Sequence, residues 1–226
     1  MNANDIKRMY GNALAGIDPK NVVIIHLAAN VGGIGANREH PADFFYDNLM
    51  MGALLMEHGR RVGVAKFVAV GTICSYPKFT PVPFKEDDLW NGYPEETNAP
   101  YGIAKLAVEH YLHFYQREHG IIPIALRYAN VFGPRQNGLG EAGVVAIFIE
   151  KFLAGQQPRI NGDGLQTRDF VFVGDIVAAN LLALDYPQAG AFNIGTGVIH
   201  SAREVVQAIC RVAPGANVDL IPSLPG

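Results

Sequence analysis

Tyr101 and Lys105 are the residues of this chain whose types and spacing most clearly suggest chemistry. Side chains at positions i and i+4 rise from one face of a helix, so on a helix these two would be neighbours. A tyrosine has an ordinary pKa of about 10, and acting as a base near neutral pH requires lowering it by roughly 3 units. A nearby ammonium group favours the phenolate and supplies part of that change. The pair therefore indicates proton transfer, although the same spacing also occurs by chance in many helices.

Three apolar strands are expected around this pair, and polar or small residues follow each of them. Residues 21–28, 66–71 and 122–127 are β-rich apolar runs, typical of strands buried on both faces of a parallel sheet. Their ends read His26-Leu-Ala-Ala-Asn30, Gly71-Thr-Ile-Cys-Ser-Tyr-Pro77 and Leu126-Arg-Tyr-Ala-Asn130. Open α/β sheets bind ligands at the carboxyl ends of their strands, so we expect one crevice there, with the Thr72 hydroxyl beside the tyrosine–lysine pair.

Helices are predicted between these strands. Apolar residues recur at helical spacing over residues 41–63, and residues 101–119 are good helix formers followed by Gly120. Strands alternating with helices predict a doubly wound parallel α/β sheet. Beyond residue 130 we expect helices at 144–153 and 175–184, strands at 168–173 and 191–195, and a last helix to about residue 212 that begins with the capping box Ser201-Ala-Arg-Glu204.

The composition narrows the classes of partner. The 226 residues are 49% hydrophobic and 17% charged with a formal net charge of −3, which is typical of a globular protein and gives no basic patch for nucleic acid or an anionic membrane. The two cysteines, Cys74 and Cys210, form neither a disulfide framework nor a metal-ligand spacing. No apolar run approaches the roughly 20 residues of a membrane helix. We expect a soluble protein of a reducing cytoplasm, without a metal site.

Five motifs, in this order, resemble the extended short-chain dehydrogenase/reductase family, the NAD-dependent nucleotide-sugar epimerases and dehydratases. They are Leu27-Ala-Ala29, Gly71-Thr-Ile-Cys-Ser-Tyr-Pro77, Tyr101-x-x-x-Lys105, Arg127-Tyr-Ala-Asn-Val-Phe-Gly-Pro134 and Gly162-Asp-Gly-Leu-Gln-Thr-Arg-Asp-Phe-Val171. The resemblance implies an incomplete Rossmann-type sheet. Residues 1–127 would form a partial NAD(P)-binding domain, and residues 128–226 would form mainly a smaller substrate-binding α/β region with strands and helices that return to the sheet.

The resemblance also implies a role for each matching residue. Tyr101 would be the acid/base on a sugar hydroxyl, Lys105 would orient the nicotinamide ribose and lower the tyrosine pKa, and Thr72 would hydrogen-bond the reacting oxygen. The other implied contacts are Leu27, Ala28, Ala29 and Tyr128 with NAD, or with NADP as the alternative, and Cys74, Asn130 and Arg168 with the nucleotide-diphosphate sugar. A surface ion pair with Asp169 or another neighbour is the simpler interpretation of Arg168.

The neighbours of the catalytic residues distinguish among the reactions of the family. Dehydratases resemble one another in an acidic pair directly after the threonine, where this chain has Ile73 and Cys74, so a dehydratase is not expected. Cys74 resembles the cysteine of GDP-fucose synthases and GDP-mannose 3,5-epimerases. Their second acid/base would fall within residues 141–145, which contain neither histidine nor lysine. That stretch, and much of the chain after Tyr101, resembles UDP-glucose 4-epimerases.

These resemblances favour NAD-dependent 4-epimerisation of a UDP-sugar, rather than a GDP-sugar, through a 4-keto intermediate formed by reversible hydride transfer. A fucose-synthase-like epimerase-reductase and a non-catalytic ligand-binding relative are the alternatives. The chain is either a natural intermediate between two subfamilies or a join of two homologous halves.

One family motif has no match in this sequence. The glycine-rich turn, Gly-x-x-Gly-x-x-Gly, is absent, and Gly32-Gly-Ile-Gly35 is a poor substitute because it follows an internal strand. We therefore expect that two β–α units and a C-terminal tail are missing and that the chain could be an inactive fragment. The resemblance implies a homodimer for the full-length protein.

Overall fold

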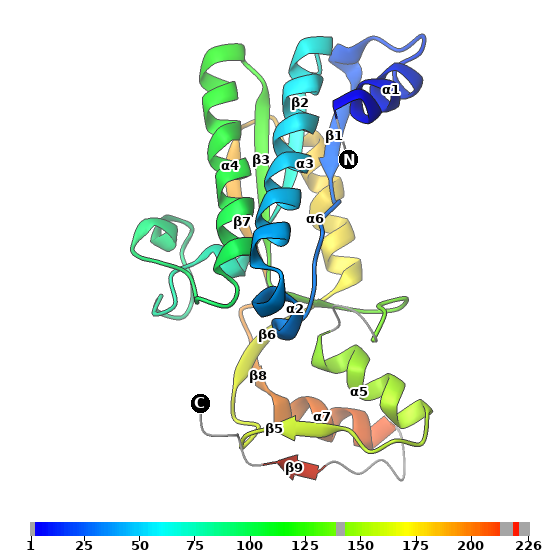
Figure 1. The fold of residues 1–226 in the computed structure, drawn as a ribbon, viewed down its shortest axis with the longest axis vertical. Coiled ribbons are helices and arrows are strands. Elements are labelled where there is room, and N and C mark those ends of the chain that lie inside the picture. The colour runs from blue at the N-terminus through cyan, green and yellow to red at the C-terminus, as the bar shows by residue number, and fades with distance from the viewer. Residues whose placement is uncertain (1–2, 139–142, 213–218, 222–226) are drawn as a thin grey trace. The chain divides into compact units, whose positions relative to one another are not determined.

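A computed structural model describes residues 3–138, 143–212 and 219–221 (Figure 1). The chain divides into two compact units. The first comprises residues 1–128 and 177–194, and the second comprises residues 129–176 and 195–226. The predicted site residues up to Tyr128 belong to the first unit, and Asn130 and Arg168 belong to the second.

A four-stranded parallel sheet forms the centre of the first unit. Its strand order is β1-β2-β3-β7, with β1 at Val23–His26, β2 at Lys66–Thr72, β3 at Ile122–Tyr128 and β7 at Gly190–Ile194. The register pairs His26 with Ala69, and Ala69 with Ala125. This arrangement confirms the parallel α/β sheet that the apolar runs predict.

Helices cover both faces of this sheet. One face packs against α3 (Pro41–Val62) and α4 (Ala99–His119), with α1 (Ala3–Ala13) beside α3, and the other face packs against α6 (Val173–Asp185). Because successive residues of a strand point to opposite faces, Phe67 lies in the α3–α4 core and Val68 in the α6 core. Both long helices end at glycines in the left-handed conformation, Gly63 (φ 92°) and Gly120 (φ 69°), as their C-caps require.

Short elements join these layers. They are the helix α2 (Ile34–Glu39) and three 3₁₀ turns: η1 (Pro19–Asn21), η2 (Ile73–Ser75) and η3 (Glu86–Trp90). The turn η2 directly follows β2, and η3 lies in the proline-rich loop before α4. The end of β2 and the start of α4 are therefore connected by loop residues rather than by a further strand.

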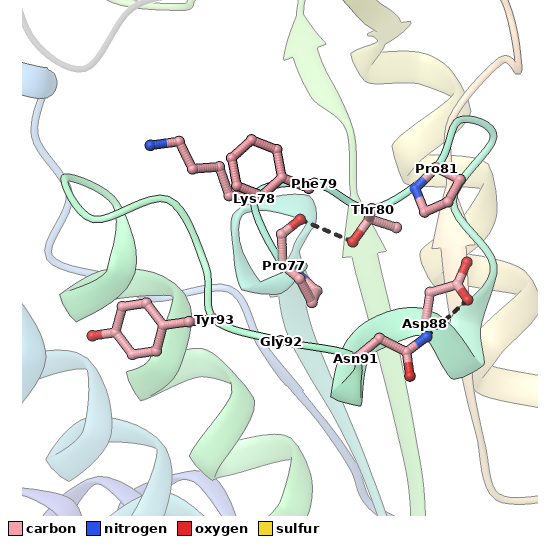
Figure 2. A pocket seen from close by; sticks show the side chains of 9 residues that line it. All are labelled: Pro77, Lys78, Phe79, Thr80, Pro81, Asp88, Asn91, Gly92 and Tyr93. Carbon is pink, nitrogen blue, oxygen red and sulfur yellow. Dashed lines mark hydrogen bonds between the residues drawn. The ribbon is translucent and has the colours of Figure 1, made fainter.

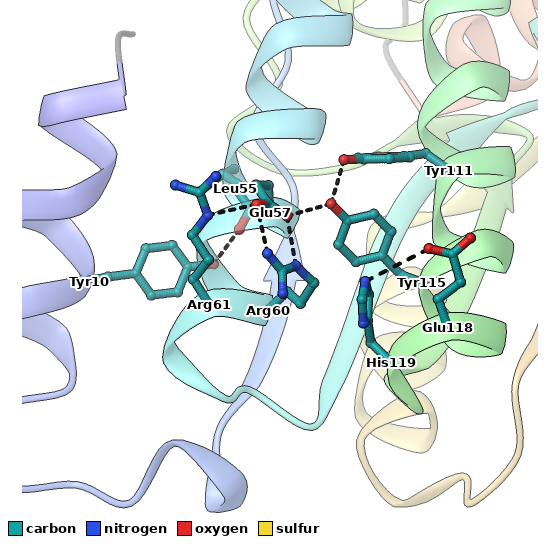
Figure 3. Close-up of polar contacts among 9 residues, drawn as sticks. All are labelled: Tyr10, Leu55, Glu57, Arg60, Arg61, Tyr111, Tyr115, Glu118 and His119. Carbon is teal, nitrogen blue, oxygen red and sulfur yellow. Dashed lines mark hydrogen bonds and ion pairs between the residues drawn. The ribbon is translucent and has the colours of Figure 1, made fainter.

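A polar cluster on α3 and α4 joins these two helices (Figure 3). The Glu57 carboxylate accepts hydrogen bonds from Arg60 Nε at 2.8 Å, Arg61 Nε at 2.6 Å and the Tyr115 hydroxyl at 2.5 Å. These bonds, above all the one from Arg60, hold the pKa of Glu57 well below its usual range. The Tyr115 hydroxyl also bonds the Tyr111 hydroxyl. The cluster therefore fixes α4 against α3.

The second unit holds two small sheets and two helices. The strands β4 (Asn130–Phe132), β6 (Thr167–Phe172) and β8 (Ile199–Ser201) form one sheet, and β5 (Arg159–Asn161) pairs with β9 (Asp219–Ile221). The helices α5 (Val144–Leu153) and α7 (Ala202–Val212) enclose a core that includes Phe148 and Val206. The predicted capping box is present, since Ser201 N donates to Glu204 Oε2 at 2.7 Å and Glu204 N donates to Ser201 Oγ at 3.2 Å.

No helix in the described part of the chain is long and apolar enough to cross a membrane.

Candidate active site at the strand ends

Tyr101 and Lys105 lie one turn apart near the beginning of α4. The Lys105 Nζ atom is 5.8 Å from the centroid of the Tyr101 ring. Lys105 is 4% exposed and Tyr101 is half-buried, so their charges interact in surroundings that water screens only in part. An ammonium group at this distance favours the phenolate form of a tyrosine. The geometry suits a tyrosine that exchanges a proton.

The first turn of α4 packs against the turn that follows β2. Ser75 Oγ donates a hydrogen bond to the Gly102 carbonyl oxygen at 2.8 Å, and a Cβ atom at Gly102 would overlap the carbonyl oxygen of Cys74. Thr72 is buried at the end of β2, and its Oγ1 accepts a hydrogen bond from Cys74 N at 3.1 Å. These contacts hold the turn after Thr72 against the first turn of α4, the turn that carries Tyr101.

The end of β1 contributes a buried histidine followed by two exposed apolar residues. His26 is 4% exposed, whereas Leu27 is 62% exposed and Ala28 is also exposed. Asn30 is fixed to α3, since its backbone N–H donates to Asn48 Oδ1 at 3.0 Å and its carbonyl accepts from Asn48 Nδ2 at 2.7 Å. The segment from Leu27 to Asn30 is therefore anchored at Asn30, whereas Leu27 and Ala28 are open to a ligand.

Tyr128 ends β3 directly opposite Thr72 in the parallel register. Its hydroxyl accepts a hydrogen bond from Asn180 Nδ2 of α6 at 2.6 Å, and burial raises its pKa. Tyr128 packs in the core on the α6 face of the sheet. Its contact with a cofactor stays a prediction.

Arg127, the residue before Tyr128, forms a network that sequence analysis did not predict. Its guanidinium donates to both carboxylate oxygens of Glu109 on α4, at 2.5 and 3.1 Å, and to the Tyr76 hydroxyl at 2.7 Å. Tyr76 in turn donates to Asn193 Oδ1 of β7 at 2.6 Å. The network fixes the loop after Thr72 between α4 and the sheet. The sequence signal for this contact is the alternation along β3, which places Arg127 on the face of the sheet that α4 covers.

The two predicted diphosphate-binding residues lie on adjacent strands of the second unit. Asn130 begins β4, and its Nδ2 donates to the Asp169 carbonyl of β6 at 3.2 Å. Arg168 lies on β6, and its Nη1 donates to the Thr167 carbonyl at 2.7 Å. Asp169 is an expected partner of Arg168 in a surface ion pair. Its carboxylate accepts hydrogen bonds from Thr196 N, Thr196 Oγ1 and Gly197 N. The sequence has no histidine or lysine within residues 141–145 to act as a second acid/base. Residues 141 and 142 of that stretch lie outside the described residues.

A small cavity lies beside the site, in the loop between η2 and α4 (Figure 2). Its walls include Phe79, Asp88 and Tyr93. Two polar side chains of its wall are bonded within the loop: Thr80 Oγ1 donates to the Pro77 carbonyl at 2.8 Å, and Asp88 accepts from Asn91 Nδ2 at 3.2 Å. None of the predicted catalytic residues lines the cavity, so it is a hollow of the loop and not the candidate site.

The described residues fit one end of a nicotinamide dinucleotide. The exposed Ala28 and the Tyr101–Lys105 pair suit a flat ring and its ribose. Gly32 does not suit a phosphate cradle, because a Cβ atom there would lie 2.8 Å from both Ala36 Cβ and Phe44 Cζ, and close packing accounts for this glycine. Within the described ranges no glycine-rich turn leads from a first strand into a long helix, and we assign no residues to the cofactor's diphosphate.

Comparisons with known proteins give this site a context. Residues 16–195 match the model of the NAD dependent epimerase/dehydratase family. A putative UDP-glucose 4-epimerase of Methanocaldococcus jannaschii is 39% identical over 193 residues, and a GDP-L-fucose synthase of Sinorhizobium fredii is 36% identical over 205 residues. The two alignments cover 83% and 88% of this chain but only 59% and 65% of those relatives. The chain thus spans about three-fifths of the length of these relatives.

A solved structure extends this similarity to the fold. The UDP-glucose 4-epimerase of Thermotoga maritima with UDP-glucose superposes with a TM-score of 0.87 at 35% sequence identity. The superposition covers 100% of this chain and 71% of that chain. Both units of this chain therefore have a counterpart in the fold of one enzyme.

Proposed function

This chain belongs to the NAD-dependent epimerase/dehydratase family, and we propose that it carries the proton-transfer centre of a UDP-sugar 4-epimerase. The observation that carries this proposal is the position of Lys105 Nζ, 5.8 Å from the ring of Tyr101, on a helix whose first turn contacts the loop after Thr72. The similarity to UDP-glucose 4-epimerases over most of the chain supports the substrate class.

The proposed chemistry assigns a task to each of the three residues. Tyr101, as a phenolate, takes the proton of the sugar hydroxyl, and Lys105 stabilises that phenolate by its charge. The Thr72 hydroxyl donates a hydrogen bond to the reacting oxygen. NAD, when bound, would supply reversible hydride transfer at the sugar carbon, and the keto sugar would turn over in the pocket to present its opposite face. Tyr101 then gives its proton back to the oxygen of the inverted carbon, which leaves the protein unchanged.

Further residues would hold the ligands. We propose that Leu27, Ala28, Ala29 and Tyr128 border the nicotinamide end of NAD, with NADP as the alternative. Asn130 and Arg168 would hold the diphosphate of the substrate, because the planar fork of an arginine matches phosphate oxygens. Cys74, half-buried in the turn after Thr72, would lie next to the sugar.

Cys74 also favours a second candidate, a GDP-sugar epimerase-reductase. The cysteine resembles that of fucose synthases, and a GDP-L-fucose synthase is among the relatives. The two reactions differ in their use of cofactor. A reductase consumes one reduced cofactor for each product, whereas a 4-epimerase regenerates its cofactor in every cycle.

The test compares sugar conversion by the chain and by Tyr101→Phe. UDP- and GDP-sugars are incubated with NAD or NADPH, and the products are identified by NMR. Loss of general acid/base catalysis should slow 4-epimerisation about 10²–10⁴-fold. Tyr46→Phe, which removes the hydroxyl of a tyrosine that is 63% exposed, serves as the control.

Three results would contradict the proposal. Equal and measurable rates of conversion by the chain and by Tyr101→Phe would remove the tyrosine from the chemistry. Stoichiometric oxidation of NADPH with a GDP-sugar would favour the reductase. Binding of UDP-sugar and NAD without any conversion would favour a non-catalytic relative.

A further inference from the structure

The buried His26 lies on the same side of the sheet as Lys105. On β1, Ile24 packs in the core beneath α3 and α4, whereas Val23 and Ile25 pack in the core beneath α6. Side chains alternate between the two faces of a strand. His26, two residues after Ile24, therefore points toward the α3–α4 face, which is the face that α4 covers with Lys105.

The residues in the same row of the sheet as His26, on this face, are small. The parallel register places Ala69 beside His26 and Ala125 beside Ala69, and both alanines are buried. Two methyl side chains in one row leave room between the sheet and α4 for longer side chains. His26 reaches into this layer from β1 and Lys105 from α4, and each is 4% exposed.

We propose that His26 is a positioning residue for Lys105, its uncharged imidazole providing the polar surroundings that keep the buried ammonium charged and beside Tyr101. This inference rests on the proposed function, in which Lys105 stabilises the Tyr101 phenolate. A buried ammonium loses its proton more readily as its surroundings become less polar, and the loss would remove the charge that the tyrosine needs. The edge of the Phe67 ring, whose centroid is 6.1 Å from that of His26, limits how the imidazole can turn.

The charges in this layer are compatible with a neutral imidazole. Burial, and secondly the charge of Lys105, lower the pKa of His26 to about 4, so the ring carries no charge at neutral pH and does not repel the ammonium. Among the described charged side chains of this layer, Glu109 of α4 bonds Arg127 of β3, and farther along α3 Glu57 bonds Arg60. The charges within each pair largely offset.

The test measures the pKa of Tyr101 in the full chain by following the ultraviolet absorbance of tyrosinate as the pH is raised. The signal of Tyr101 is the difference between each protein and the same protein with Tyr101→Phe. Leucine at position 26 fills the space without a polar atom, whereas glutamine keeps one. His26→Leu should raise the pKa of Tyr101 by about one unit, and His26→Gln should leave it within a few tenths. His58→Leu, on α3 and in ring contact with Tyr10, should change nothing and serves as the matched control.

The outcomes separate this inference from the proposed function. Circular dichroism first establishes which variants fold, and His26→Met replaces the leucine variant if that one does not. An unchanged Tyr101 pKa in a folded apolar variant would overturn the inference, as would an equal rise in His26→Gln, which would show a packing effect. Lys105→Met should also raise the pKa of Tyr101. If it does not, the Tyr101–Lys105 interaction itself fails, and the proposed function fails with it.

Discussion

At the scale of single residues, the Arg127–Glu109 ion pair is a buried polar contact near the candidate site. The two side chains are 4% and 7% exposed, and two hydrogen bonds join them. Burying two charges is costly unless each is paired and its remaining hydrogen-bonding capacity is used. Here Arg127 Nη1 also donates to the Tyr76 hydroxyl and to the Glu86 carbonyl at 3.0 Å. The pair therefore joins β3, α4 and the loop after β2 in one arrangement.

Removing one partner of this pair should be far more damaging than removing both. We expect Arg127→Met to lower the free energy of unfolding by about 3–5 kcal/mol, because it leaves the Glu109 carboxylate buried and unpaired. The double variant Arg127→Met, Glu109→Leu should regain most of this loss. Urea unfolding, followed by circular dichroism and by the fluorescence of the single tryptophan, Trp90, measures both.

Arg117→Met is the matched control for the ion pair. Arg117 lies on the same helix with a side chain that is 72% exposed, and its replacement should change the free energy of unfolding by less than about 0.5 kcal/mol. If Arg127→Met were as stable as this control, the buried pair would not be a stabilising contact.

The residues of the site differ in how far the sequence could predict them. Tyr101 and Lys105 could be paired from their spacing alone, because the helix repeat is a local property. The positions of His26 and Arg127 depend on which residues β1 and β3 place beside those of β2. Nothing local to His26 or Arg127 specifies that register, so neither their burial nor their partners could be predicted.

At the scale of elements, the contact between α4 and η2 determines where Tyr101 lies. A Cβ atom at Gly102 would overlap the Cys74 carbonyl oxygen and would lie 3.3 Å from Ser75 Cα. These are backbone atoms, which cannot turn away as a flexible side chain can. Gly102→Ala should therefore force α4 away from the turn, lower the free energy of unfolding by about 1–3 kcal/mol and change the pKa of Tyr101. Urea unfolding and tyrosinate absorbance measure the two effects.

Gly11→Ala is the control for this substitution. Gly11 lies in α1, and a Cβ atom there would have no neighbour within 4 Å. Because alanine favours a helix interior over glycine, this variant should be more stable by about 0.5–1 kcal/mol. If both variants gained stability alike, close packing of α4 on η2 would not require a glycine.

The extent of an element's buried apolar pattern decided whether it could be predicted. The strands and helices of the first unit have long apolar patterns, so β2, β3, α3 and α4 could be placed within one or two residues of their observed ends. The helix α1 was missed because Ile6 and Tyr10 are its only buried residues. The strands β4, β5 and β8 have three residues each. Such strands are defined by their partners, and three residues show no periodicity.

At the scale of the molecule, the first unit presents an unpaired strand edge on its sheet and apolar surface on one helix. Among the described strands, β1 pairs with β2 only, and such a strand edge readily pairs with another chain. On α6, Val177, Leu181 and Leu182 are 52%, 57% and 74% exposed. A helix with apolar residues on all sides is ordinarily buried. This surface should bind other apolar surfaces.

We therefore expect the chain to bind the dye anilinonaphthalene sulfonate and to self-associate as its concentration rises. Leu182→Lys places a charge on the apolar face of α6 and should reduce both properties, while changing the free energy of unfolding by less than about 0.5 kcal/mol because the position is exposed. Leu153→Lys makes the same change at an 83% exposed leucine of α5, in the second unit. Dye fluorescence and analytical ultracentrifugation measure the two effects. Equal behaviour of the two variants would show that α6 has no special part in association, and a monomer that binds no dye would show that this apolar surface is covered in solution.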